Sequence, residues 1–241
     1  MINRNFVVLD LETTGLTPKK DRILEIGAVK IQDGRITETY ETFVNPMIGI
    51  PPTITKLTGI TDKMVENAPD NTTAVTGFLE FCGDLPLLGH NISFDYRFIK
   101  HSAVNLGLSF EKEALDTLHI ARCALPDLES RSLEYLCSYY GISRENAHRA
   151  MDDVMETLEL YIRLETEYAG SHPEWFRFVP LICKMKRENP ATAAQRKYLE
   201  DLIRYHRITV NVPMESLTKN EASRLIDGII LNYGRIETRR K

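Results

Sequence analysis

The first predicted strand of this chain carries two acidic residues, and their spacing constrains the fold more than any other feature. Residues 7–16 read VVLDLETTGL, an apolar run that holds Asp10 and Glu12 and stops in a Thr-Thr-Gly turn. Residues i and i+2 of a strand point to the same side, so both carboxylates share one face while Leu9 and Leu11 pack behind them. Two like charges at the end of a core strand are costly unless cations such as Mg²⁺ or Mn²⁺ neutralise them. The spacing also fits two solvated acids on an edge strand, so the choice depends on other residues.

Two more acids fall on the apolar faces of predicted helices. Asp95 shares such a face in the helix that begins near Ser93. In the last long helix before the C-terminal region, Asp153 points inward, whereas Asp152 joins Glu156 on the polar face. Asp95 alone also fits a favourable charge in the first turn of a helix. Four inward-facing acids on elements that should converge favour a metal site instead.

The order of strands and helices predicts an α/β fold. Alternating patterns predict strands over 22–31 and 36–44, and the Asp33-Gly34 hairpin signal between them implies an antiparallel meander with the first strand. The short apolar run 85–88 is typical of a buried parallel strand, and a further strand is predicted over 114–116. The predicted helices cover residues 70–81, 93–106, 117–123, 132–140 and 149–168. We therefore expect a mixed sheet of three antiparallel and two parallel strands, flanked by helices.

The charge distribution divides the chain into an acidic body and a basic appendage. Up to Cys183 there are 17 Lys and Arg against 27 Asp and Glu, and from Lys184 there are 13 against 7. We predict a catalytic body over residues 1–168, a strap or linker over 169–190 and a basic helical hairpin over 191–241. The two hairpin helices should begin at capping boxes. These boxes pair Thr192 with Gln195 and Thr218 with Glu221.

Composition also indicates where in the cell the protein is expected to be. The four cysteines are far apart and form no metal-binding pattern, so they fit reduced thiols of a cytoplasmic protein. The apolar runs are too short for a membrane span, and we expect no membrane partner. Because Met1 leads almost directly into the first strand, we also expect no signal peptide.

Three motifs in order resemble one family of nucleases. The first is LDLETTGL at residues 9–16, the second GHNISFD at 89–95 and the third HRAMDD at 148–153. With the segments LTGIT at 57–61 and LDT at 115–117, these motifs make residues 5–166 similar to the DnaQ-like (DEDDh) 3′→5′ exonucleases. Within that family the likeness is greatest to PolC proofreading domains and to DNA polymerase III epsilon subunits.

This resemblance implies a ribonuclease H-like fold and a two-metal site. Asp10, Glu12, Asp95 and Asp153 would hold two Mg²⁺ or Mn²⁺ ions, about 3.5–4 Å apart, with Asp10 as the bridge. His148 would be the general base, since an imidazole titrates near neutrality. On one continuous helix His148 and Asp153 would point about 140° apart, so we place His148 at the entry to the helix.

The resemblance also implies contacts with the terminal nucleotide. The turn after the first motif and the start of the second motif would supply them, through residues Thr13, Thr14, Gly15, Leu16, His90, Asn91 and Phe94. Each of these residues also fits a role in packing or in turn formation.

The predicted function is metal-dependent hydrolysis of single-stranded 3′ ends, preferably of DNA, to release nucleoside 5′-monophosphates in proofreading or repair. One alternative is an RNA-trimming exonuclease of the same family, and another is a non-catalytic module that binds nucleic acid or a polymerase. A DNA polymerase catalytic subunit is the expected protein partner for proofreading. The basic appendage would hold nucleic acid near the site, although surface lysines and arginines are also commonly just solvated.

Overall fold

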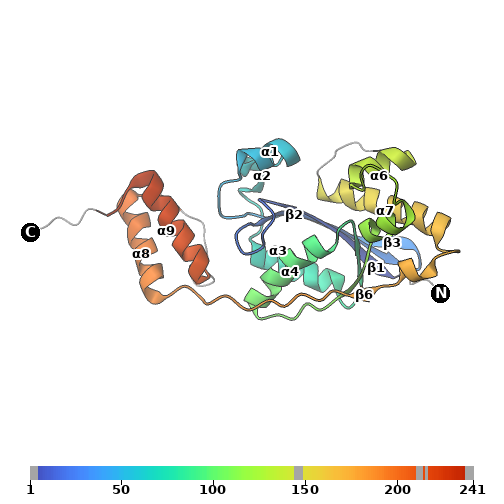
Figure 1. Ribbon diagram of the computed structural model, residues 1–241. Coiled ribbons are helices and arrows are strands. Elements are labelled where there is room, and N and C mark those ends of the chain that lie inside the picture. The colour runs from blue at the N-terminus through green and yellow to red at the C-terminus, as the bar shows by residue number, and fades with distance from the viewer. Residues whose placement is uncertain (1–4, 144–148, 210–213, 215–216, 237–241) are drawn as a thin grey trace, which may run out of the picture. The chain divides into compact units, whose positions relative to one another are not determined.

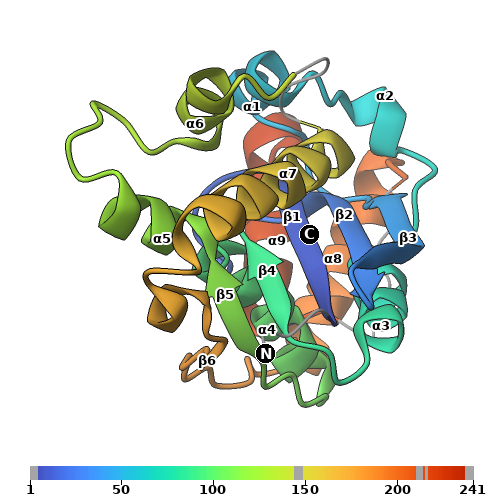
Figure 2. The same cartoon turned by 90° about the vertical axis from the view of Figure 1, so that its right-hand side faces the viewer.

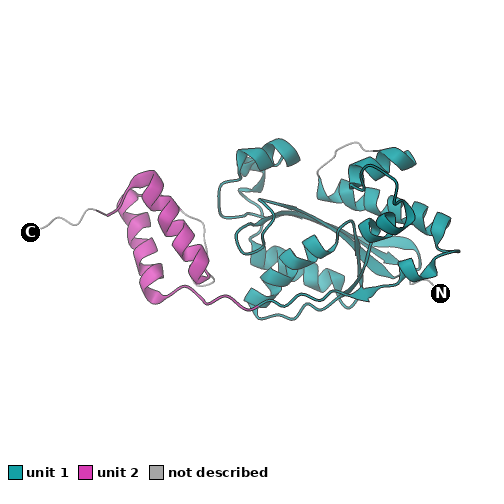
Figure 3. Ribbon diagram, in the orientation of Figure 1, with its two compact units in different colours: residues 1–185 teal, residues 186–241 magenta. Residues whose placement is uncertain are grey.

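The structure is a computed structural model that describes residues 5–143, 149–209, 214 and 217–236. The chain divides into two compact units, Met1–Met185 and Lys186–Lys241, coloured separately in Figure 3. The boundary therefore falls inside the stretch that was expected to be a strap. In the described part of the chain, no helix is both long and apolar enough to cross a membrane.

The first unit is built on one mixed sheet with the strand order β3-β2-β1-β4-β5-β6. The strands are β1 Phe6–Thr13, β2 Ile23–Gln32, β3 Arg35–Phe43, β4 Leu87–Gly89, β5 Glu113–Asp116 and β6 Val179–Pro180. The first three pair antiparallel, and β1, β4 and β5 pair parallel. The turn between β2 and β3 has positive φ at both Asp33 and Gly34, as a tight hairpin requires. The predicted mixed sheet is confirmed.

The sheet has one strand more than the five that were expected. Val179 and Pro180 form β6, which pairs antiparallel with the outer edge of β5. A two-residue strand has no periodicity that the sequence could reveal. Its pairing covers a sheet edge that would otherwise present unpaired main-chain groups.

Helices cover both faces of the sheet, as Figure 2 shows. They are α1 Pro52–Thr58, α2 Asp62–Val65, α3 Asn71–Cys82, α4 Ser93–Leu106, α5 Thr117–Ala124, α6 Leu133–Tyr140, α7 Ala150–Tyr168 and the short 3₁₀ helix η1 Pro173–Phe176. Residues Val7, Leu9 and Leu11 of β1 pack in the core with α3 and α4. Phe6 and Val8 pack in the opposite core with α5, α6 and α7. Asp10 and Glu12 continue the row of Phe6 and Val8, so they face the side on which α7 lies.

One detail of the α7 prediction is wrong. Glu156 was placed on a polar face, but it is buried. The physical reason is that α6 packs on that side of α7, where Cys137 Sγ lies 3.9 Å from a Glu156 carboxylate oxygen. Asp153 is buried and Asp152 is half-buried, in the order that the helical period predicts.

The second unit contains α8 Ala193–His206 and α9 Lys219–Tyr233, which pack around their own small core (Figure 1). Both predicted capping boxes are present. The helices do not form the expected hairpin, because they run parallel. At their starts, Gln195 Nε2 donates to the main-chain oxygen of Lys219, and at their ends a His206 ring nitrogen lies 3.0 Å from the Gly234 oxygen.

Main-chain pairing explains this parallel arrangement. The Ala191 N–H donates to the Leu217 oxygen and the Lys219 N–H donates to the Asn189 oxygen, so the segments that precede the two helices form a bridge. Each helix then starts at the same end of the unit. The helical periods of α8 and α9 cannot reveal this, because the bridge joins Pro190 and Thr218, which are far apart in the sequence.

Candidate active site

Three carboxylates meet where β1 ends beside the start of α7. Asp10 and Glu12 project from β1, and Asp153 projects from the first turn of α7, where its N–H donates to the Arg149 oxygen. One ligand oxygen from each of the three lies within 4.8 Å of the others. This arrangement brings together residues that are more than a hundred positions apart in the sequence.

The fourth predicted acid lies against the main chain of the same strand. Asp95, in the first turn of α4, is only 3% exposed, and its Oδ1 accepts the Leu11 N–H at 3.1 Å. The paired register of β1 and β4 ends at Val8 and Leu88, so β4 gives no partner to β1 at the level of Leu11. The Asp95 carboxylate instead accepts the hydrogen bond of Leu11, the residue between Asp10 and Glu12.

The acids strongly perturb one another. Burial, followed by the charges of Asp95 and Asp153, raises the pKa of Asp10 well above its usual value. Burial, followed by the charges of Asp153 and Glu25, raises the pKa of Glu12 to about 8. Burial also raises the pKa of Asp95 well above its usual value. A cation in this cluster would remove most of that cost, because it attracts every carboxylate that the others repel.

The donor set fits hard divalent cations. The cluster found among the described residues is made only of carboxylates, without His or Cys. Carboxylate oxygens are the ligands of Mg²⁺ and Mn²⁺, whereas thiolate and imidazole groups favour softer metals. The donor set is therefore one that suits a hard divalent cation.

We expect the metal-free protein to lose stability as the pH rises from about 5 to about 8. The pKa of Glu12 is about 8 in the folded chain against a usual value of 4.5, so the folded chain holds a proton that the unfolded chain has released. The free energy of unfolding then falls as pH rises across this window. Thermal denaturation in EDTA measures the effect, and added Mg²⁺ should raise the melting temperature more at the higher pH, because the metal replaces protons. A melting temperature in EDTA that rises over the same range contradicts this electrostatic account.

The turn after β1 is held by its own side chains. Thr13 Oγ1 donates to the Gly15 oxygen at 2.7 Å, and Thr14 Oγ1 accepts the Arg22 N–H at 2.8 Å. A Cβ on Gly15 would lie 2.6 Å from the Asp21 carboxyl group, so only glycine fits there without a shift. Leu16, in contrast, is 80% exposed. Of the four turn residues that were predicted to touch substrate, Leu16 presents the most accessible side chain.

In the second motif, both ring nitrogens of His90 contact other groups of the protein. One ring nitrogen lies 2.9 Å from Thr117 Oγ1 and the other lies 2.8 Å from the Arg131 oxygen. Burial lowers the pKa of His90, which favours the neutral ring. His90 therefore anchors the loop and leaves no ring nitrogen for a nucleotide.

Asn91 and Phe94 occupy different environments. Asn91 is exposed, has a φ of 66°, and donates its main-chain N–H to Asp116 Oδ1 at 2.8 Å. Phe94 is half-buried and packs against Phe98, with 5.1 Å between ring centroids. These contacts fix the loop that leads into Asp95, and they leave the Asn91 side chain at the surface.

Sequence reasoning missed three residues that support the site, namely Glu25, Arg149 and Asp116. Glu25 on β2 stands directly opposite Glu12, and it binds Arg149 at the start of α7. Asp116 fastens the second motif through Asn91. The available signal for Glu25 was an acid inside an otherwise apolar strand. His148, the predicted base, lies outside the described residues.

Comparisons with known proteins show what this chain resembles. A family model described as an exonuclease, RNase_T, matches residues 7–161. The chain is 43% identical over 155 residues to the PolC-type DNA polymerase III of Clostridium perfringens, a match that covers 64% of this chain and 11% of that protein. It is 35% identical over 179 residues to the DNA polymerase III subunit epsilon of Aquifex aeolicus, covering 74% of this chain and 86% of that one. The chain thus spans only about a ninth of the PolC-type relatives.

Two solved structures illustrate the shared fold. Exonuclease X in complex with 5′ overhanging duplex DNA aligns with a TM-score of 0.55 and 25% identity, over 68% of this chain and 93% of that one. E. coli exonuclease I in complex with a dA16 oligonucleotide aligns with a TM-score of 0.61 and 22% identity, over 72% and 42%. Both similarities support the mixed sheet flanked by helices described above.

Proposed function

This chain belongs to the RNase_T exonuclease family, as its motifs predicted, and we propose that it is a metal-dependent 3′→5′ exonuclease. The substrate is a single-stranded 3′ end, preferably of DNA, and the products are nucleoside 5′-monophosphates. One observation carries the proposal: half-buried Asp10 and Glu12 cluster with buried Asp153, and Asp95 completes the cluster on the main chain beside it. Such a cluster is costly in a folded protein without a cation, and it is the donor set that phosphodiester hydrolysis with two metal ions uses.

Asp10, Glu12, Asp95 and Asp153 would hold two Mg²⁺ or Mn²⁺ ions. Bound ions supply positive charge that activates an attacking water and stabilises the leaving 3′ oxygen. Of the protein's own groups, His148 remains the predicted acceptor of the water's proton. Leu16 is exposed at the rim, where it can insert beside the terminal base, and Gly15 lets the main chain approach the nucleotide closely.

The preference for DNA rests on the relatives. Proteins described as PolC-type DNA polymerase III and DNA polymerase III subunit epsilon share 35–45% identity with this chain. The structure of exonuclease X at 25% identity holds duplex DNA with a 5′ overhang. A DNA polymerase catalytic subunit is accordingly the proposed protein partner, and co-purification with one would separate a proofreader from an independent repair nuclease.

The experiment that tests this function compares labelled oligonucleotides of one sequence. A 5′-labelled single-stranded DNA should shorten in single-nucleotide steps from its 3′ end when Mg²⁺ or Mn²⁺ is added, while EDTA stops the reaction. Label placed at the 3′ end should appear at once as a nucleoside 5′-monophosphate. Faster trimming of the matched RNA would favour the RNA-processing alternative, and binding without cleavage would favour the non-catalytic module.

A further inference from the structure

The start of α7 is held by a carboxylate from a different element. α7 has no side-chain cap of its own, and its N-cap residue is Arg149. Glu25 Oε2, from β2, accepts the Ala150 N–H at 3.2 Å. Acceptors are needed there because the first N–H groups of a helix have no partner within it, and a negative charge is favourable at that end.

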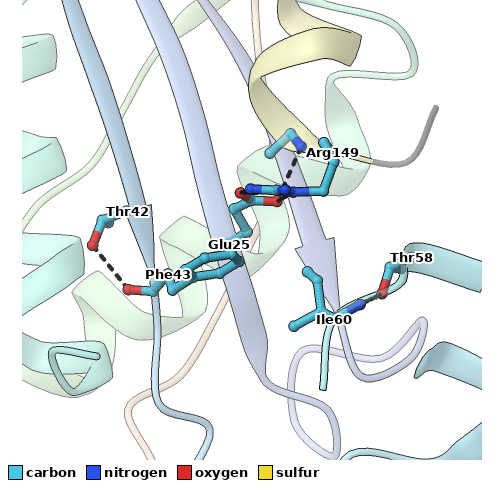
Figure 4. Close-up of polar contacts among 7 residues, drawn as sticks. Glu25, Thr42, Phe43, Thr58, Ile60 and Arg149 are labelled. Atoms are coloured by element: carbon cyan, nitrogen blue, oxygen red, sulfur yellow. Dashed lines mark hydrogen bonds and ion pairs between the residues drawn. The ribbon is translucent and has the colours of Figure 1, made fainter. Parts of the chain in front are cut away.

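The same carboxylate also binds the Arg149 side chain. Arg149 donates from Nη2 to Glu25 Oε1 at 2.8 Å, and its Nε lies 3.2 Å from each carboxylate oxygen. Figure 4 shows the guanidinium facing the Glu25 carboxylate. The Glu25 side chain is 1% exposed, while that of Arg149 is 34% exposed. A planar fork of this kind fixes the arginine in orientation as well as in position.

Two further contacts make this junction tight. The Arg149 guanidinium carbon lies 5.1 Å from the centre of the Phe43 ring, on the strand next to β2. On β2 itself, a Cβ at Gly27 would lie 2.5 Å from the Ala150 carbonyl carbon. The strand thus approaches the helix backbone so closely that α7 has little room to shift at this end.

The junction is connected to the acidic cluster from both sides. The Arg149 oxygen accepts the N–H of Asp153, the carboxylate that faces Asp10 and Glu12. Across the sheet, Glu25 is the direct antiparallel neighbour of Glu12. Without Arg149, Glu25 would add a fifth uncompensated acid next to the site. With Arg149 bound, the Glu25–Arg149 ion pair links β2, the strand next to Glu12, to α7, the helix that carries Asp153.

We propose that Glu25 is a positioning residue of the metal site, which acts through Arg149 to hold Asp153 at the distance from Asp10 and Glu12 that the ions require. This inference rests on the proposed function. Groups that orient metal ligands from behind change metal affinity about 10- to 100-fold when they are removed. Glu25 is not itself placed among the ligands, because both of its oxygens are engaged by Arg149 and Ala150.

The test measures Mn²⁺ affinity by titration calorimetry on the full chain, together with kcat and KM on single-stranded DNA. We expect Glu25→Gln to weaken Mn²⁺ binding about tenfold and to lower kcat while the KM for DNA stays within twofold of wild type. Glu38→Gln is the matched control, because Glu38 is an ion-paired glutamate on the neighbouring strand whose partner is Lys30. It should leave all three quantities unchanged.

The double variant Glu25→Gln with Arg149→Gln separates coupled positioning from two independent effects. Its loss of Mn²⁺ affinity should match that of Glu25→Gln alone, since both changes break one link. If Glu25→Gln fails to fold, Arg149→Lys replaces it, because lysine keeps the charge and lacks the fork; about a tenfold loss is again expected.

A lowered melting temperature with wild-type Mn²⁺ affinity overturns the inference, because the ion pair would then be merely structural. An additive loss in the double variant overturns it as well. A failure of the proposed function looks different, since wild-type protein itself would then bind no Mn²⁺ and cleave no DNA.

Discussion

Replacing Asp10 by asparagine is expected to reduce exonuclease activity at least about a thousandfold, because the metal site supplies several kcal/mol of transition-state stabilisation. Asp10 is the acid whose pKa is raised by burial and by both Asp95 and Asp153, which marks it as the centre of the cluster. Asparagine keeps the size of the side chain but loses the charge that draws cations. The rate of nucleotide release from single-stranded DNA in saturating Mg²⁺ measures the effect, and Asp10→Ala should behave in the same way.

The fold should survive this change. In EDTA at about pH 8 the Asp10→Asn protein should melt no lower than wild type, since one of the mutually repelling carboxyl groups is gone. Asp33→Asn is the control, because it removes an acid in the turn after β2 where φ is 51° and asparagine is tolerated. Activity of Asp10→Asn within tenfold of wild type would refute the assignment of the site.

Removing the second unit, residues 186–241, is expected to weaken binding to long single strands about ten- to hundredfold and to flatten its dependence on salt. From Lys184 onward the sequence carries 13 Lys and Arg against 7 Asp and Glu, whereas the preceding part is acidic. Each phosphate contact on a single strand contributes about 0.7 to the slope of log K against log salt, so the loss of three contacts would lower the slope by about 2. Fluorescence anisotropy over a salt series gives both quantities.

The truncated chain should still fold and cleave, because the first unit contains its own cores on both faces of the sheet. Cleavage of a dinucleotide, which is too short to reach beyond the site, serves as the control and should be unchanged. If affinity for long strands and the salt slope both match the full chain, the second unit does not hold nucleic acid.

Local sequence patterns were sufficient to predict most of the helices and strands of the first unit. The apolar period placed α4 at Ser93–Leu106, and the Asp33-Gly34 signal placed the β2–β3 turn. These features depend on residues that are close in sequence. β6 depends instead on an edge strand 65 residues earlier, since Val179 pairs with Ala114. The parallel course of α8 and α9 likewise depends on a bridge between Pro190 and Thr218.

The site shows the same division between local and distant information. The spacing of Asp10 and Glu12 predicts a shared face, and the helical period separates Asp153 from Asp152. The period could not show that Asp95 bonds to the Leu11 main chain, which is 84 residues away in sequence. Nor could it pair Glu25 with Arg149 at a separation of 124 residues. Supporting contacts of this kind depend on tertiary packing, which no local sequence pattern predicts.

The hydrogen bond from Leu11 to Asp95 gives the protein an internal reporter. The acceptor of that single amide is a carboxylate, and the electron density on its oxygens changes when a proton leaves or a cation binds, so the chemical shift of the Leu11 amide changes with it. Leu9 and Leu11 face the core, and their amides share one strand. The Leu11 resonance in a nitrogen–proton correlation spectrum therefore reads the occupancy of the centre directly, with the amide of Leu9 on the same strand as an internal reference.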